Sequence, residues 1–369
     1  MTIKTIAVTA LALALAAVGA AACGDDDDGG DGGGGEGGGK KIALLLPETK
    51  TTRYEQHDRP GFTNKVKELC PDCEVLYANA AQDATKQQAQ AEAVITKGAA
   101  VLVLDAVDAD AAATMVERAK QSDVPVIAYD RLISDADIDY YVSFDNVRQG
   151  RIEARTLLDK LGNDGDGKSI VMINGSPTDP SAGDYKKGAH QVFDASGVEI
   201  AKEYDTPDWS PDKAQLEMEQ AITALGKENI DAVYSANDGM AGGAIAAMKS
   251  AGIDPREVPV TGGDAEVAAI QRILAGEQFM TIYLTIKKQA EVSAQLAVAA
   301  ANGDKPPSGL INAKVDNGQK QVPSVLLTPV AVTKDNINDT IIADGFLELG
   351  EICRGEYAAM CKEAGLGGG

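Results

Sequence analysis

Apolar runs alternate with longer amphipathic stretches along most of the chain. Residues 41–46 read KIALLL, a nearly continuous apolar run of the kind found in strands that are buried on both faces of a sheet. Similar runs recur at 100–104 and 124–129, with helix-like stretches and short connections between them. This alternation predicts a parallel α/β sheet. The expected strands of the first half are 41–46, 74–78, 100–104 and 124–129, and the expected helices are 62–69, 84–97 and 109–121.

The second half of the chain repeats this order. The closest correspondence sets 100–104 against 231–235, and each of these segments is followed by a helix of small residues and then by a Val-Pro-Val sequence. Both copies then run into an aspartate, Asp130 or Asp264. We therefore expect a second lobe, with strands at 169–174, 199–203, 232–235 and 258–262 and helices at 185–196, 212–225 and 240–251.

Polar residues follow the predicted strands of both halves. In open parallel sheets, ligands bind outside the carboxyl ends of the strands. Two doubly wound lobes that face each other would therefore enclose a cleft between those ends. Five polar side chains come directly after predicted strands and are expected to converge on this cleft: Asp130, Arg131, Asn237, Asp238 and Asp264.

These residue types suit a sugar ligand. A pyranose offers hydroxyl groups that donate and accept hydrogen bonds, and apolar faces that stack on flat rings. The chain has one tryptophan, Trp209, in a Pro-Asp-Trp-Ser-Pro loop without apolar periodicity, and we interpret it as a ligand platform rather than as a core residue. Arg53 and Tyr54 follow the first strand and are also candidates for the site. They would equally fit solvated loop residues that contact no ligand. Asp130 and Arg131 taken alone would also fit a surface ion pair.

From residue 41 to about residue 346, the chain resembles the bacterial periplasmic xylose-binding proteins of the pentose/hexose solute-binding superfamily. A long ordered series of motifs carries the resemblance: YDR at 129–131, DADID at 135–139, SFDN at 143–146, GSP at 175–177, SAND at 235–238, AGGAI at 241–245, GDA at 263–265, PS at 323–324 and LTP at 327–329. The resemblance implies a periplasmic binding protein type I fold, with two doubly wound parallel-sheet lobes joined by a three-segment hinge.

The resemblance also implies a set of sugar contacts. Three positions depart from the family pattern: Tyr54 stands in place of a tryptophan, Ser181 in place of an asparagine, and Leu284 in place of a sugar-contacting lysine. Because the lysine is a charged donor, its loss leaves the identity of the sugar open. The contacts carried over by position are Arg53, Tyr54, Asp130, Arg131, Asp179, Ser181, Trp209, Asn237 and Asp264.

In this family the lobes exchange strands three times, and these crossings are expected near 144–147, 279–283 and 322–329. The N-terminal lobe would comprise 40–144 and 284–322, and the C-terminal lobe 145–283 and 323–363, followed by a flexible tail at 364–369. The resemblance further implies that the lobes close over a monosaccharide, most closely D-xylose or a similar aldopyranose. We expect a monomer that presents its closed form to the permease of an ABC transporter.

The N-terminus predicts export. Residues 1–22 combine Lys4, an apolar stretch and small residues, as a secretory signal does. Cys23 follows three alanines and precedes a glycine, which resembles the lipobox of bacterial lipoproteins, although Ala20 stands where leucine is usual. An ordinary signal cleaved nearby stays open as an alternative. Residues 23–39 are almost wholly Asp and Gly, which predicts a disordered tether that holds the protein above the outer face of the membrane.

Four further cysteines fit an exported protein, in which disulfides persist. Among three connectivities we favour local pairing of Cys70 with Cys73 and of Cys353 with Cys361. A redox motif or half of a zinc site at 70–73 is the alternative.

Charge and composition argue against several classes of function. The formal net charge of −22, with no run of Lys or Arg, opposes nucleic-acid binding. The chain has two histidines and lacks the motifs of a nucleophile elbow, a phosphate-binding loop or a metal site, so we expect no catalysis, cofactor or metal. A sugar-responsive transcription regulator shares the two-lobed core, but a signal and tether stand here in place of its DNA-binding segment. A sensor that presents its sugar to a membrane receptor stays open.

Overall fold

The computed structural model describes residues 39–366, and what we call the first lobe is built on a seven-stranded sheet. The strand order is β10-β11-β5-β4-β3-β1-β2, and all neighbours are parallel except β10 and β11. The strands are β1 (Lys41–Leu46), β2 (Glu74–Asn79), β3 (Ala99–Leu104), β4 (Val126–Tyr129), β5 (Tyr140–Phe144), β10 (Ala313–Asp316) and β11 (Gln321–Leu327).

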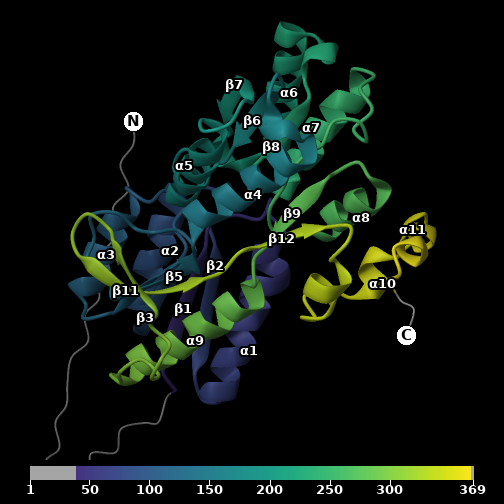
Figure 1. The fold of residues 1–369 in the computed structure, drawn as a ribbon. Coiled ribbons are helices and arrows are strands. Elements are labelled where there is room, and N and C mark those ends of the chain that lie inside the picture. The colour runs from purple at the N-terminus through teal and green to yellow at the C-terminus, as the bar shows by residue number, and fades with distance from the viewer. Residues whose placement is uncertain (1–38, 367–369) are drawn as a thin grey trace, which may run out of the picture. The chain divides into compact units, whose positions relative to one another are not determined.

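Helices cover both faces of this sheet (Figure 1). One face packs on α2 (Ala84–Thr96) and α3 (Ala112–Lys120), and the other on α1 (Arg59–Leu69) and α9 (Ile286–Asn302). Alternate residues of β1 enter the two cores, Ala43 and Leu45 on the α2 side and Ile42 and Leu44 on the α1 side. Burial on both sides explains why β1 is apolar at almost every position.

The second lobe is built on the parallel sheet β7-β6-β8. Single bridges from Val233 to Val260 and from Gly263 to Ile282 continue it toward the antiparallel pair β9 and β12. The strand expected at 258–262 is reduced to the first of these bridges. The elements are β6 (Ser169–Asn174), β7 (Glu199–Asp205), β8 (Ala232–Ser235), β9 (Met280–Tyr283), β12 (Val330–Thr333), α4 (Asn146–Leu161), α5 (Pro180–Phe193), α6 (Pro211–Leu225), α7 (Asp238–Ser250) and α8 (Val267–Ala275).

The chain passes between the two sheets at three places: from β5 to α4, from β9 to α9, and from β11 to β12. The third crossing comes later than the boundary expected after residue 322. The strand β11 remains paired with β5 as far as Leu327, which lies opposite Phe144. Residues 323–327 therefore belong to the sheet of the first lobe.

The C-terminal segment packs on the second lobe. Beyond β12 it forms η5 (Asn338–Ile342), α10 (Leu349–Ile352) and α11 (Tyr357–Glu363), drawn in yellow beside α8 in Figure 1. Leu366 is buried in the same apolar cluster as Ile270 and Ile352. Residues 364–366 are thus no free tail, because an apolar side chain holds them to the lobe; residues 367–369 lie outside the described part.

Two helices begin earlier than expected. The residues around Arg53 and Tyr54, expected in a loop, form the first turn of a helix whose π-helical start, η1 (Tyr54–Asp58), runs directly into α1. Pro60 lies in the first turn of α1, and because proline has no backbone N–H it cannot donate a hydrogen bond to the preceding π-helical turn. The helix α5 starts at Pro180, with Asp179 as its N-cap, and not at residue 185.

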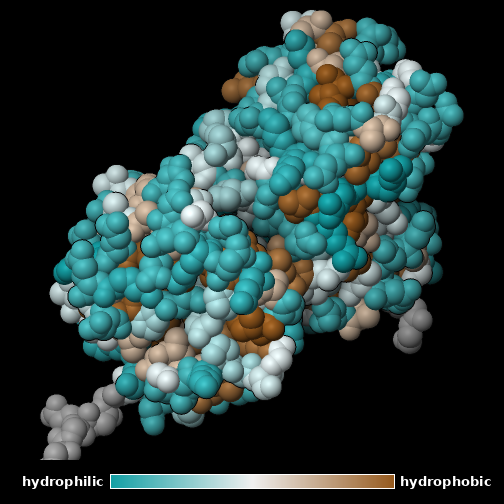
Figure 2. All heavy atoms as spheres, turned by 60° about the vertical axis from the view of Figure 1, so that its left-hand side comes forward, coloured by the Kyte–Doolittle hydropathy of each residue, from teal (hydrophilic) through white to brown (hydrophobic). Residues whose placement is uncertain are grey.

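The disulfide prediction is confirmed. Cys70 pairs with Cys73 in the turn between α1 and β2, and Cys353 pairs with Cys361 between α10 and α11. The predicted signal, Cys23 and the predicted tether, apart from Gly39, lie outside the described residues. Within residues 39–366, no helix is both long and apolar enough to cross a membrane. The face shown in Figure 2 is mainly hydrophilic, in keeping with the acidic composition.

Candidate functional site

A cavity lies where the carboxyl ends of strands from both lobes meet. Thr51, Arg53 and Tyr54 follow β1, and Asp130 and Arg131 follow β4. From the second lobe, the segments after β6, β7 and β8 reach the same space. The complete lining is Thr51, Arg53, Tyr54, Asp130, Arg131, Gln149, Asp179, Tyr185, Trp209, Ala236, Asn237 and Asp264.

Three of the positions singled out in the sequence, Ser181, Asp238 and Leu284, do not line this cavity. The Ser181 hydroxyl lies behind it, where it accepts a hydrogen bond from Asn146 Nδ2 at 3.2 Å and donates one to the Asp130 carbonyl at 3.5 Å. Leu284 is buried in an apolar cluster with residues such as Ile270 and Ile286. Leu284 therefore adds to the apolar core of the lobe and contributes no polar group to the cavity wall.

Asp130 is the centre of the wall from the first lobe. It has a φ of +62° at the end of β4, a conformation that turns the chain directly after the strand. Its Oδ1 accepts hydrogen bonds from Arg53 Nη1 at 3.2 Å and from Gln289 Nε2 at 2.9 Å, and Tyr54 donates to Oδ2 at 3.4 Å. Gln289 comes from α9, a helix that was not predicted from the sequence.

Arg53 is held in a fixed orientation by a second carboxylate. Its Nε and Nη2 donate to the two oxygens of Asp58 at 3.0 and 2.9 Å, a bidentate pair that is almost wholly buried. Tyr129 also donates to Asp58. Such planar two-point pairing fixes the guanidinium in space. The helical turn around residue 53 is therefore what aims this side chain into the cavity.

Arg131 connects the two lobes. Its Nε lies 2.9 Å from Asp179 Oδ2 of the second lobe, and its Nη1 donates to the Ala106 carbonyl at 3.0 Å. Asp105 lies 3.5 Å away and is completely buried. Burial raises the pKa of Asp105 well above its usual value, although Arg131 opposes the shift. Breaking such a buried pair leaves an uncompensated charge, so the pair favours the closed lobes.

Trp209 forms the flat part of the second-lobe wall. It ends a short turn, η3 (Pro207–Trp209), and its indole Nε1 donates to Asp179 Oδ2 at 3.1 Å. The ring lies against Gly175, where an added Cβ would meet indole atoms at 2.1–2.5 Å. Tyr185 meets the indole edge-on, with ring centroids 6.3 Å apart. The site thus depends on glycine at 175 for the position of its only indole.

Asn237 and Asp264 complete this wall. Asn237 caps α7 by accepting the Met240 N–H at 2.9 Å, so its NH2 group is the part left for a ligand. Asp264 has a φ of +92°, and among the described residues none donates a hydrogen bond to its carboxylate. Burial raises the pKa of Asp264 well above its usual value, with Arg53 opposing the shift. A ligand that donates hydrogen bonds would satisfy this carboxyl group.

Asp238, also expected at the cleft, faces the interior of the second lobe. Its oxygens accept hydrogen bonds from Gln278 Nε2 at 2.7 Å, from the Thr281 hydroxyl at 2.9 Å and from the Glu266 N–H at 3.0 Å. It anchors the segments before and within β9 rather than a ligand.

Four lining residues were not predicted from the sequence: Thr51, Gln149, Tyr185 and Ala236. Gln149 lies in α4 after the first crossing, where no helix was assigned. A polar residue on the buried face of an amphipathic helix is the signal that would have identified it.

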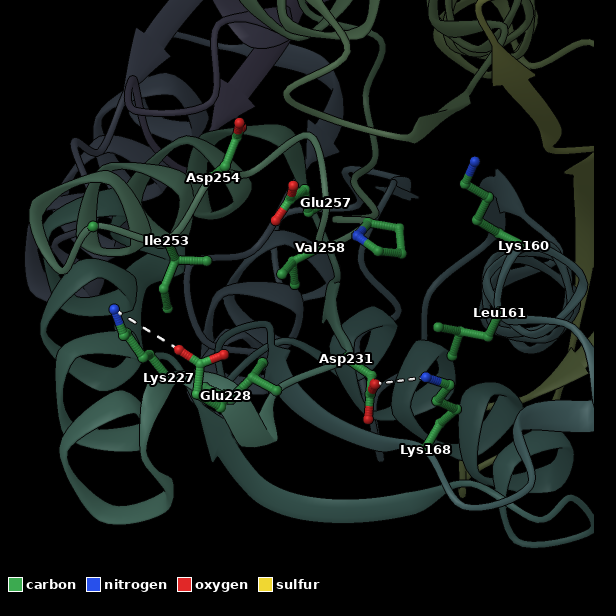
Figure 3. A pocket seen from close by; sticks show the side chains of 13 residues that line it. Lys160, Leu161, Lys168, Lys227, Glu228, Asp231, Ile253, Asp254, Glu257 and Val258 are labelled. Atoms are coloured by element: carbon green, nitrogen blue, oxygen red, sulfur yellow. Dashed lines mark hydrogen bonds and ion pairs between the residues drawn. The ribbon is translucent and has the colours of Figure 1, made fainter.

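A wider pocket, of about 400 Å³, lies at the amino ends of the second-lobe strands (Figure 3). Lys168 and Asp231 precede β6 and β8 and pair there at 2.8 Å, and Lys227 and Glu228 lie 3.8 Å apart. These charges are solvated and neutralise one another. The pocket contains none of the residues predicted from the sequence, so the cavity between the lobes is the candidate site.

The chain is similar to exported binding proteins over most of its length. Residues 42–305 match the family model described as periplasmic binding protein domain. The D-xylose-binding periplasmic protein of Escherichia coli (strain K12) is 37% identical over 318 residues, covering 85% of this chain and 92% of that protein. The corresponding Haemophilus influenzae protein is 38% identical over 310 residues, covering 83% and 90%. A solved ABC transporter solute binding protein from Clostridium phytofermentans with bound β-D-glucose has a TM-score of 0.76 and 26% identity, covering 85% of this chain and 100% of that one.

Proposed function

Because this chain belongs to the periplasmic binding protein domain family, we propose that it captures one monosaccharide between its lobes and delivers it to the permease of an ABC transporter. D-xylose or a similar aldopyranose is the ligand that we favour. One observation supports this most: carboxylates, guanidinium groups and a single indole from both lobes line one cavity.

The chemistry of the wall matches a neutral, hydroxyl-rich ligand. Asp264 accepts hydrogen bonds from sugar hydroxyls, and the Asn237 NH2 group donates to them. The indole of Trp209 offers a flat apolar surface for the C–H face of a pyranose. Arg53 and Arg131 are paired with carboxylates, so their positive charges are already neutralised and do not favour an anionic ligand.

Closure follows from contacts that need both lobes. Besides the pair of Arg131 with Asp179, Thr52 donates through its N–H and its hydroxyl to Glu266 Oε1 at 3.2 and 3.1 Å. A sugar that contacts both walls adds interactions that exist only in the closed form. It therefore shifts the equilibrium toward closure.

We place the protein outside the cytoplasmic membrane, in the periplasm or at the cell surface, as a monomer anchored by a lipid on Cys23. The Asp/Gly-rich stretch 23–39 would act as the tether. Palmitate labelling in the producing bacterium tests the anchor, and Cys23→Ala should abolish the labelling.

A thermal-shift panel of pentoses, hexoses, amino acids and nucleosides tests the function. A ligand that binds the folded state raises the melting temperature, and we expect the largest rise with D-xylose or a close aldopyranose. Trp209→Ala and Asp264→Ala should abolish the rise, whereas Asp110→Ala, at an exposed position of the first lobe, should keep it. A response to an amino acid or a nucleoside, with none to any monosaccharide, would contradict the proposal.

Experiments can distinguish this function from two others, that of an enzyme and that of a sensor. The chain is not an enzyme, as its relatives are solute-binding proteins, so candidate sugars should be recovered unchanged after incubation. A sensor role gains support from a 34% identical relative that is named a multiple sugar-binding periplasmic receptor. Deletion of the receptor partner would then abolish a sugar response while uptake continues.

A further inference from the structure

Gln149 is a buried polar residue at the cavity whose side-chain oxygen has no partner within residues 39–366. It lies in α4 and lines the cavity, and 1% of its surface is exposed. Among the described residues, none donates a hydrogen bond to its Oε1. An unsatisfied buried acceptor costs roughly 1–3 kcal/mol, so a folded protein seldom keeps one without a use.

The position of Gln149 is fixed by close packing of α4 on α5. A Cβ added at Gly150 would lie 2.0 Å from the Tyr185 carbonyl oxygen, and one added at Gly188 would lie 2.1 Å from the Val147 carbonyl oxygen. The two backbones therefore touch where the glycines lie. This contact brings Gln149 and Tyr185 together at the cavity wall.

The amide of Gln149 also lies beside the Gly263-Asp264 turn. A Cβ added at Gly263 would be 3.5 Å from Gln149 Nε2. Gln149 and Asp264 thus both line the second-lobe wall of the cavity, with the Gln149 amide nitrogen next to the turn that precedes Asp264.

The two walls of the cavity differ in how many of their hydrogen-bond acceptors are already paired with protein donors. In the first lobe, Asp130 accepts from Arg53, Gln289 and Tyr54. In the second lobe, Asp264 and Gln149 Oε1 accept from no described residue. Ligand hydroxyls that donate hydrogen bonds find their free acceptors in this second wall.

We propose that Gln149 is a sugar-contacting residue that determines specificity, with its Oε1 accepting a hydrogen bond from a ligand hydroxyl beside the one that Asp264 binds. The inference rests on the proposed function and names one more contact at the same site. A sugar that lacks this hydroxyl leaves the amide oxygen unpaired in the closed cavity, and the site discriminates against such a sugar.

Calorimetric titration of Gln149→Leu with D-xylose and D-glucose tests the contact. We expect at least tenfold weaker binding of whichever sugar binds the wild type more tightly. The ligand-free melting temperature should stay equal or rise, because leucine removes an orphan acceptor at similar volume. A structural role would instead lower this temperature. Gln88→Leu, the same change at an exposed position of α2, should bind like the wild type.

A series of monodeoxy analogues of the same sugar identifies the hydroxyl. The affinity loss caused by Gln149→Leu should disappear for one analogue and persist for the others, as a double-mutant cycle requires for a direct contact. If the leucine variant does not fold, Gln149→Met, which keeps the length of the side chain, replaces it in the same titrations. Wild-type affinity in these variants, or an equal loss for every analogue, overturns this inference alone. A wild-type protein that binds no monosaccharide overturns the proposed function as well.

Discussion

Asn237 and Asp238 are neighbours in the chain, yet their side chains belong to different parts of the molecule. Asn237 faces the cavity and caps α7, while Asp238 is completely buried beneath it among Gln278, Thr281 and the Glu266 N–H. Burial, with Glu266 adding to it, raises the pKa of Asp238 to about 7 from its usual 3.8. This carboxyl group therefore titrates near neutrality in the folded protein.

The raised pKa predicts that stability falls with rising pH. Between about pH 4 and pH 7 the folded protein retains a proton on Asp238 that the unfolded chain has lost. The folded state then binds more protons, so the free energy of unfolding decreases as the pH rises through this window, by on the order of 4 kcal/mol. Chemical denaturation at several pH values measures it. Asp238→Asn should flatten the dependence of the free energy of unfolding on pH, whereas Asp212→Asn, at an exposed position, should not. A dependence in Asp238→Asn that runs parallel to that of the wild type would show that Asp238 is not the group responsible.

At this scale the sequence located most of the cavity wall. Residues directly after strands, such as Asp130 and Asp264, were predictable because the carboxyl ends of parallel strands meet in one place. Side-chain direction was not predictable in the same way. Asp238 follows the same strand as Asn237 but points inward, and Gln149 reaches the cavity only through the packing of α4 on α5.

At the scale of elements, α4 and α5 of the second lobe pack closely through glycines. Gly188 lies on the buried face of α5, against the backbone of α4, whereas Gly183 lies on the exposed face of the same helix with no atom within 4 Å of an added Cβ. The two glycines thus form a matched pair.

We expect Gly188→Ala to destabilise the protein by about 1–3 kcal/mol, because the added methyl group forces the helices apart. The sugar affinity should fall too, since Gln149 and Tyr185 move with the helices. Gly183→Ala should stabilise by up to about 1 kcal/mol, as alanine favours a helix over glycine. Denaturant titration and calorimetry measure both effects. Equal stabilities of the two variants would show that the helices are free to separate.

Periodicity predicted the elements that are buried on both faces. It missed others, such as α4 after the first crossing and the turn at residues 53–58. Strand β1 is apolar at almost every position because two cores share it, and its prediction agrees with the structure. The turn at residues 53–58 was expected as a loop because its buried side chains, Arg53 and Asp58, are charged. A buried ion pair carries no hydrophobic period, so the pattern cannot reveal such a turn.

At the scale of the whole molecule, Asp179 joins the lobes. Its Oδ2 lies within hydrogen-bond distance of Arg131 from one lobe and of Trp209 from the other, and its Oδ1 accepts the Ser181 N–H at 2.8 Å. These protein groups occupy the carboxylate, so its main contribution to affinity is to hold the closed form. We therefore expect Asp179 to act on the sugar through the positions of Arg131 and Trp209.

Asp179→Asn should weaken sugar binding by roughly 100-fold, near the lower end of the about 3–5 kcal/mol that breaking a buried ion pair costs. Small-angle scattering should show that the variant needs correspondingly more sugar to reach the compact form. Asp205→Asn makes the same charge change at an exposed position and should behave like the wild type. If Asp179→Asn closes at the wild-type sugar concentration, the pair does not govern closure.

The three crossings mean that neither lobe is one continuous stretch of sequence. The sheet of the first lobe takes β1 to β5 from before the second lobe and β10 and β11 from after most of it, and α9 covers one of its faces. A chain divided at one peptide bond, for example after Phe144, therefore gives two fragments that each lack part of a core. Such fragments are suited to reconstitution only when both are present, which makes the molecule a candidate scaffold for split reporters.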